Sequence, residues 1–363
     1  MLKEIFFFFK KNRLYLWLLF LIGAFYAFAA LGSGSGVQNP AIEPSQAVQR
    51  FKEAERQFTD NTSVRADAFD VFAKKEPRLA LLFELFSIFF ILAIVAGIVI
   101  DILIWVRPGF RKRFLGGTEP PASRGWPFSI LFKTIILFVA WGIALSFVMG
   151  IVEAIFPAPG LANLYMVFHT FLLDILCVLF MVRFVKQQGS SWRELGFNVP
   201  GGKKLREVMI GVTGYFGVLP VFVLVLVTLL FAANLFHYEP PPHPLVNVFI
   251  EEERRFPFLV VFSVLLGAVI GPIFEEIFFR GFCYPILRGK VGKFWAVVLS
   301  SAFFASIHHT GFVFWPIFVL GVALALLYES RRSLVAPITL HIVHNSLFIG
   351  YFFLLKQIIG SNA

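Results

Sequence analysis

The feature that most constrains this chain is a series of about nine apolar runs, most of them close to 20 residues long. A helix of about 20 residues crosses about 30 Å of hydrocarbon. The runs raise the mean hydropathy to +0.80 and leave only 15% charged residues, which excludes a water-soluble enzyme. Because only helices satisfy the backbone of such segments in lipid, we expect an all-α, polytopic transmembrane bundle of about eight to nine helices. The runs lie at 14–32, 79–105, 127–152, 162–182, 208–236, 257–287, 294–309, 312–328 and 336–355.

The net charge of +10 has two possible meanings, nucleic-acid binding or membrane topology. The basic residues form short clusters between the apolar runs, and this arrangement favours membrane topology. Placing the N-terminus in the cytoplasm puts most of the 32 Lys and Arg residues in cytoplasmic loops, so we expect a cytoplasmic N-terminus and an external C-terminus. We therefore expect an integral, multi-pass protein, most naturally of a bacterial inner membrane, that binds no nucleic acid.

The N-terminal half is expected to consist of three parts. Residues 1–32 read as a transmembrane anchor; a signal peptide is the alternative, although the apolar stretch is longer than the 7–15 residues typical of one. Residues 33–78 are polar and too short for a core of their own, so we expect a helical hairpin or surface helix on the outer face. Residues 79–189 hold accessory transmembrane helices, in which His169 and Asp174 suggest local polar partnerships.

The run 257–287 contains two adjacent carboxylates and a guanidinium among Ile, Phe and Gly. Ionisable residues inside a span are costly, so each is a functional candidate. Glu276 and Arg280 are four residues apart and are placed to form an intrahelical ion pair. On a regular α-helix Glu275 is rotated by about 100° and has no such partner. We therefore expect Glu275 to be the general base or acid of a reaction.

The later runs supply imidazole and amide groups. His308 and His309 end the run 294–309, which is short enough that its helix could stop inside the bilayer, where it would line a cavity. In the last run His341 and Asn345 share one helical face, and His344 lies a turn from His341. A carboxylate and an imidazole can activate a water, while His and Asn can donate hydrogen bonds to a developing oxyanion. The combination predicts amide hydrolysis without a covalent intermediate.

These motifs resemble the signature of the CAAX-protease and bacteriocin-processing (abortive-infection) family of intramembrane proteases. The resemblance rests on E-E-x-x-x-R at Glu275, on F-x-x-x-H ending at His308, on H-x-x-x-N at His341, and more weakly on SWRELGFNVP upstream. It implies a protease domain at residues 190–355. Within that domain it implies that Glu275 and His308 activate water, that His341 and Asn345 form the oxyanion site, and that Glu276 and Arg280 support them. No metal or other cofactor is implied, and the partner would be a membrane-embedded or lipid-modified peptide substrate.

Two other functions remain open on the sequence. A zinc peptidase could use Glu275 and several histidines as ligands, although no H-E-x-x-H is present and Asn is a poor zinc ligand. A transporter or scaffold could use the same polar groups for a proton relay or a partner. The histidines in question are His308, His309, His341 and His344.

Overall fold

The computed structural model describes residues 8–34, 46–60, 62–116, 125–155, 161–197, 199, 204–238, 244–308 and 311–360. Within these residues the chain is helical and contains no strand, as the apolar runs predict. Seven helical stretches are long and apolar enough to cross a membrane, and the protein is an integral, multi-pass membrane protein. They are Pro77–Val106, Phe128–Ile155, Ala162–Gln187, Lys204–Leu235, Pro257–Ser306, Phe314–Arg331 and Val335–Gly360.

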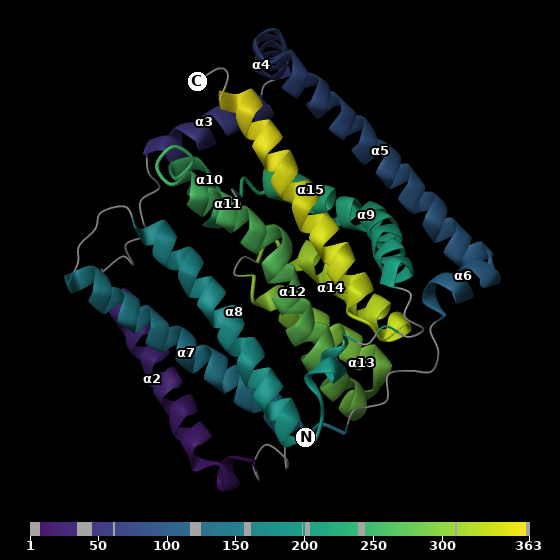
Figure 1. Ribbon diagram of the computed structural model, residues 1–363. Coiled ribbons are helices and arrows are strands. Elements are labelled where there is room, and N and C mark those ends of the chain that lie inside the picture. Colours follow the sequence, from purple (N-terminus) through teal and green to yellow (C-terminus); the bar gives the residue numbers. More distant parts are fainter. Residues whose placement is uncertain are drawn as a thin grey trace. The chain divides into compact units, whose positions relative to one another are not determined.

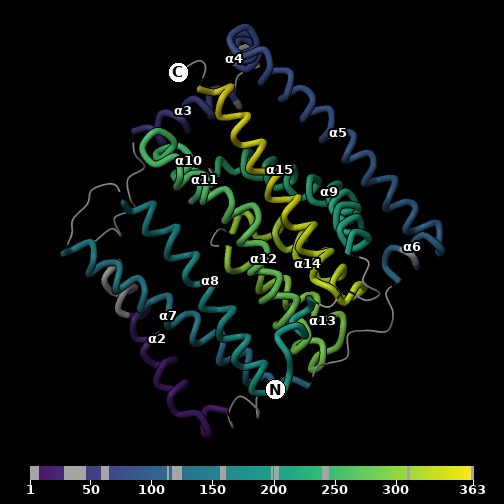
Figure 2. Tube along the Cα trace, viewed as in Figure 1, coloured from purple at the N-terminus to yellow at the C-terminus, as the bar shows by residue number. Residues whose placement is uncertain are grey.

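The longest stretch, Pro257–Ser306, holds two of the spans expected from the sequence. It contains α11 (Pro257–Leu265), η3 (Leu266–Ile270), α12 (Gly271–Glu276), η4 (Ile277–Cys283) and α13 (Tyr284–Ser306). The first four follow one another without interruption, as the trace in Figure 2 shows. Within α13, Gly292 has φ 78° and ψ 175°, a conformation that breaks the helix and that glycine adopts without steric cost. Gly292 therefore separates the run 257–287 from the run 294–309.

The chain folds as two compact units, each assembled from separate parts of the sequence. Unit 1 comprises Met1–Glu43, Pro121–Asn198 and Ile273–Ser300. Its helices are α2 (Arg13–Gly34), α7 (Phe128–Ile155), α8 (Ala162–Gln187), η1 (Trp192–Leu195) and η4, together with most of α12 and α13. Here α7 packs against both α2 and α8, and η4 packs against α8 and η1. Large apolar side chains on α2 are exposed, including Trp17 at 64%, which suits a helix that faces lipid.

Unit 2 comprises Pro44–Pro120, Val199–Pro272 and Ser301–Ala363. In this unit α9 lies between α5 and α15 and also packs against α14, and Figure 1 shows α5, α9 and α15 running beside one another. Gly97 on α5 makes one of these contacts close, because a Cβ there would lie 2.8 Å from Pro220 on α9. The helices of unit 2 are α3 (Gln46–Asp60), α4 (Thr62–Lys75), α5 (Pro77–Val106), α6 (Pro108–Leu115), α9 (Lys204–Leu235), α10 (Pro244–Glu251), α11, η3, α14 (Phe314–Arg331) and α15 (Val335–Gly360).

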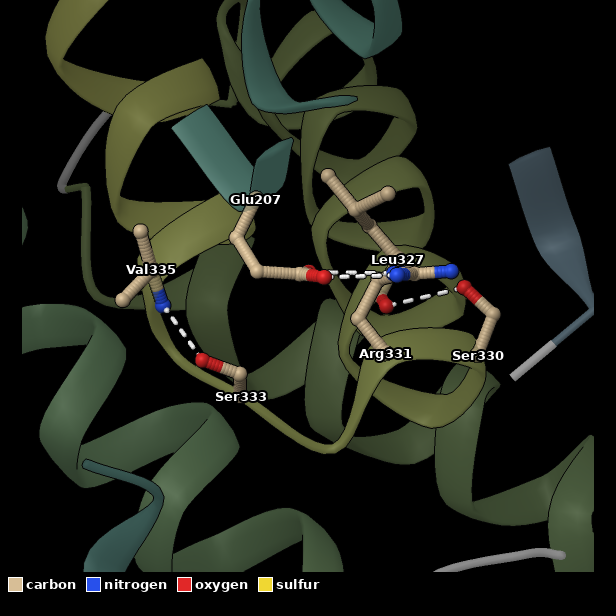
Figure 3. Close-up of polar contacts among 6 residues, drawn as sticks. All are labelled: Glu207, Leu327, Ser330, Arg331, Ser333 and Val335. Atoms are coloured by element: carbon tan, nitrogen blue, oxygen red, sulfur yellow. Dashed lines mark hydrogen bonds and ion pairs between the residues drawn. The ribbon is translucent and has the colours of Figure 1, made fainter. Parts of the chain in front are cut away.

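A buried ion pair joins the start of α9 to the end of α14 (Figure 3). The Arg331 Nη2 and Nε atoms donate to the two Glu207 carboxylate oxygens at 2.6 and 3.0 Å. Next to it, the Ser333 hydroxyl accepts a hydrogen bond from the Val335 N–H at the first residue of α15. The two helix ends that the charge pattern assigns to one side of the membrane therefore lie together.

Within its described residues the polar segment 33–78 contains two helices, α3 and α4. Helices α3 and α4 pack on each other, and α3 also contacts α10 and α15. Phe72 of α4 is buried with Ala80 of α5 and Ile358 of α15. The two helices therefore pack against the C-terminal end of α15, at the opposite end of that helix from Ser333.

Candidate active site

The predicted site residues are divided between the two units. Glu275 and Glu276 on α12 and Arg280 on η4 belong to unit 1, whereas His308, His341 and Asn345 belong to unit 2. The arrangement within each unit follows.

In unit 1, Arg280 and Glu276 form the ion pair expected from their spacing. The Nη1–Oε1 distance is 2.8 Å, and both side chains are fully buried. Arg280 also lies within electrostatic range of Glu275, so the expectation that Glu275 has no partner on its own helix does not hold. Residues 277–283, which include Arg280, form a π-helix rather than the regular α-helix that the expectation assumed.

A second carboxylate of unit 1 lies within electrostatic range of Glu275. It belongs to Asp174 on α8, the helix that packs against η4. On the same helix, the His169 Nε2 atom lies 3.2 Å from both the Ser146 hydroxyl and the Gly142 carbonyl of α7. His169 thus has the local polar partners that the sequence suggested, and Asp174 is linked to a predicted site residue.

In unit 2, the geometry of His308 fixes which ring nitrogen carries the proton. Helix α13 ends at Ser306, so His308 lies in the turn just beyond it. The His308 Nδ1 atom is 2.7 Å from the Phe304 carbonyl oxygen. Because a carbonyl oxygen only accepts hydrogen bonds, Nδ1 must be the donor. In the neutral imidazole the basic lone pair is therefore on Nε2, as a general base requires.

The phenyl ring of Phe304 contacts the imidazoles of both His308 and His341. Its centroid is 4.8 Å from the ring of His308 and 5.7 Å from that of His341, and both contacts are edge-to-face. Phe304 is fully buried, and His341 is 2% exposed. The ring limits how His308 and His341 can turn, because buried side chains are closely packed.

Asn345 lies one turn after His341 on α15 and is held by a backbone group. Its Nδ2 donates to the Gly267 carbonyl oxygen of η3 at 2.8 Å. A primary amide has two N–H donors, and this bond uses one of them. His344 faces elsewhere: its ring centroid is 4.8 Å from that of Phe222 on α9 and 5.9 Å from that of Tyr215. His344 is thus a buried packing residue in this structure.

Sequence reasoning did not predict that Phe304 packs against His308 and His341, and it did not identify Gly267 as part of the site. Phe304 appeared only as a letter of the F-x-x-x-H motif. Gly267 is one of 28 glycines, and nothing in its neighbourhood indicates a bond to a residue 78 positions later. Pro272, inside an apolar run, was the available signal of irregular backbone nearby.

Within the described residues, no three His, Cys, Asp or Glu side chains are grouped closely enough to hold a metal ion. His309, one of the candidate zinc ligands, lies outside those residues.

Comparison with known proteins agrees with the motifs. Residues 257–347, which include all six predicted site residues, match the family model described as "Type II CAAX prenyl endopeptidase Rce1-like". The chain is 28% identical over 90 residues to the "Putative membrane peptidase YdiL" of Bacillus subtilis, an alignment that covers 25% of this chain and 37% of that protein. No solved structure matches the chain significantly. Residues 257–347 are thus similar to the CAAX-protease family of membrane peptidases, over about a quarter of the chain.

Proposed function

We propose that the protein is an intramembrane endopeptidase that hydrolyses a peptide bond of a membrane-embedded or lipid-modified substrate. Glu275 and His308 activate a water molecule, and His341 and Asn345 donate hydrogen bonds to the carbonyl oxygen. Glu276 and Arg280 support Glu275. The observation that carries the proposal is the tautomer of His308, whose Nδ1 donates to the Phe304 carbonyl and leaves the basic lone pair on Nε2.

The reaction proceeds by direct attack of water. The water oxygen forms a bond to the carbonyl carbon while its proton moves to the Glu275–His308 pair, and the carbonyl oxygen becomes negative. A hydrogen bond to that oxygen is worth about 10²- to 10³-fold in rate. When the C–N bond breaks, the proton passes to the leaving amine, which yields a carboxylate and an amine.

Two features of unit 2 support the roles of His341 and Asn345. His341 is buried against Phe304, and Asn345 has one amide hydrogen fixed on Gly267. Fixed donors stabilise a developing charge more strongly than mobile ones, because they need not reorganise during the reaction. The second Nδ2 hydrogen of Asn345 is the one assigned to the oxyanion.

The deciding experiment compares the wild-type protein with Glu275→Gln in membranes or detergent. The probes are a farnesylated peptide with a CAAX end and, because prenyl specificity is not assumed, a survey of new peptide termini in the membrane proteome. The matched control is Glu84→Gln, which changes an exposed carboxylate on α5. We expect Glu275→Gln to lower the rate by at least about 10²-fold, as for loss of a general base, and Glu84→Gln to leave it unchanged.

Two outcomes would contradict the proposal. Undiminished cleavage by Glu275→Gln would show that Glu275 is not the base. Activity that disappears with a chelator and returns with zinc would favour a metallopeptidase. If neither wild type nor Glu275→Gln forms new termini or cleaves the peptide, the transporter or scaffold function takes precedence.

A further inference from the structure

The backbone of η3 leaves one carbonyl group without a backbone donor from the next turn. The Gly271 N–H donates to the Leu266 carbonyl five residues earlier, which defines the π-turn. In the same register, residue 272 would donate to the Gly267 carbonyl, but residue 272 is proline and has no N–H. A proline ring also clashes with the carbonyl four residues earlier, here that of Ala268, which explains why the helix widens at this point.

The Asn345 amide supplies the donor that Pro272 lacks. Its Nδ2 reaches the Gly267 carbonyl at 2.8 Å from α15, 78 residues later in the chain. Gly267 lies in a tight space: a Cβ there would be 3.0 Å from the side chain of Leu245 and 3.4 Å from that of Ile349. An unsatisfied carbonyl in such surroundings would cost free energy, so the carbonyl holds the Asn345 amide in one orientation.

We propose that Pro272 is a positioning residue, which acts through the Gly267 carbonyl to orient the amide of Asn345. Its catalytic consequence rests on the proposed function, in which the second Nδ2 hydrogen of Asn345 binds the oxyanion. Pro272 itself touches no substrate in this proposal. Because proline has no backbone N–H, residue 272 does not compete for the Gly267 carbonyl, and the Asn345 amide binds that carbonyl instead.

The test is Pro272→Ala, which supplies an N–H in position to compete for the Gly267 carbonyl. With the farnesylated CAAX peptide, we expect kcat to fall toward the level of Asn345→Ala while KM changes little, because the lost interaction is made in the transition state. The matched control is Pro316→Ala, which removes a buried proline from the first turn of α14. Pro316→Ala should leave both constants unchanged.

A double-mutant cycle separates positioning from general damage. If Pro272 acts through Asn345, then Pro272→Ala causes no further loss in the Asn345→Ala background. If the losses in kcat instead multiply, Pro272 acts by another route and the proposal is wrong.

A second measurement needs no activity. In protein labelled with ¹⁵N-asparagine, the Asn345 side-chain amide is identified by its absence in Asn345→Ala. We expect one of its two hydrogens to exchange slowly in wild type and both to exchange rapidly in Pro272→Ala. Rapid exchange of both in wild type, or no change in Pro272→Ala, would overturn the proposal. Because this signal is independent of hydrolysis, its outcome is distinguishable from a failure of the proposed function.

Discussion

We expect that replacing either member of the Glu207–Arg331 ion pair strongly reduces stability, and that the effects of the two replacements are coupled. The side chains of the pair are only 4% and 8% exposed, and two hydrogen bonds of 2.6 and 3.0 Å join them (Figure 3). Removal of one partner leaves the other charge buried and uncompensated, which costs about 3–5 kcal/mol. With an unfolding entropy of about 2.1 cal/mol/K per residue, 1 kcal/mol shifts the Tm of a 363-residue chain by roughly 1.3 °C. We therefore expect Glu207→Ala or Arg331→Ala to lower Tm by about 4–7 °C.

The assay is thermal unfolding in detergent, followed by circular dichroism, for the two single variants and for the double variant Glu207→Leu/Arg331→Met. The double variant should lose much less stability than the single variants together, because two apolar side chains of similar volume can replace a buried pair at little cost. The control is Arg206→Ala, an exposed charge one residue earlier on α9. The reasoning would be refuted if the single variants were as stable as Arg206→Ala. It would also be refuted if the double variant lost as much stability as the two single variants together.

Two further predictions concern packing. Gly211→Val places a Cβ 2.5 Å from the Ala336 carbonyl and 2.6 Å from Thr339, so we expect a loss of about 1–3 kcal/mol in unfolding experiments. Gly150→Val on α7, where nothing lies within 4 Å, is the control and should lose less. Phe304→Leu should lower kcat in protein that is still folded at the assay temperature, because a smaller side chain lets the imidazoles of His308 and His341 turn. A kcat equal to that of the wild type would show that the ring does not restrain them.

The helical architecture could be predicted from the sequence because each span carries its own signal. About 20 apolar residues must form a helix in lipid whatever their neighbours are, so the runs coincide with the observed helices. The same holds for local pairs such as Glu276 and Arg280, whose spacing of four residues is enough to bring them together.

Contacts that depend on irregular backbone or on distant segments could not be predicted in this way. The sequence argument for Glu275 assumed a constant α-helical turn, whereas residues 277–283 form a π-helix. The bond between Asn345 and Gly267 spans 78 residues, and that between Arg331 and Glu207 spans 124. Spacing rules apply only within one element, so they carry no information on these pairs.

The segment that matches the family model contains only some of the partners that hold its last helix. His341 and Asn345 lie within residues 257–347, but α15 packs along α9, which lies outside them. Gly211 lets the two helices approach closely, and Phe222 packs on His344. The orientation of the predicted oxyanion groups therefore depends in part on α9, which lies outside the matched segment. Activity must for that reason be tested on the full chain, with substitutions on α9 as well as in the matched segment.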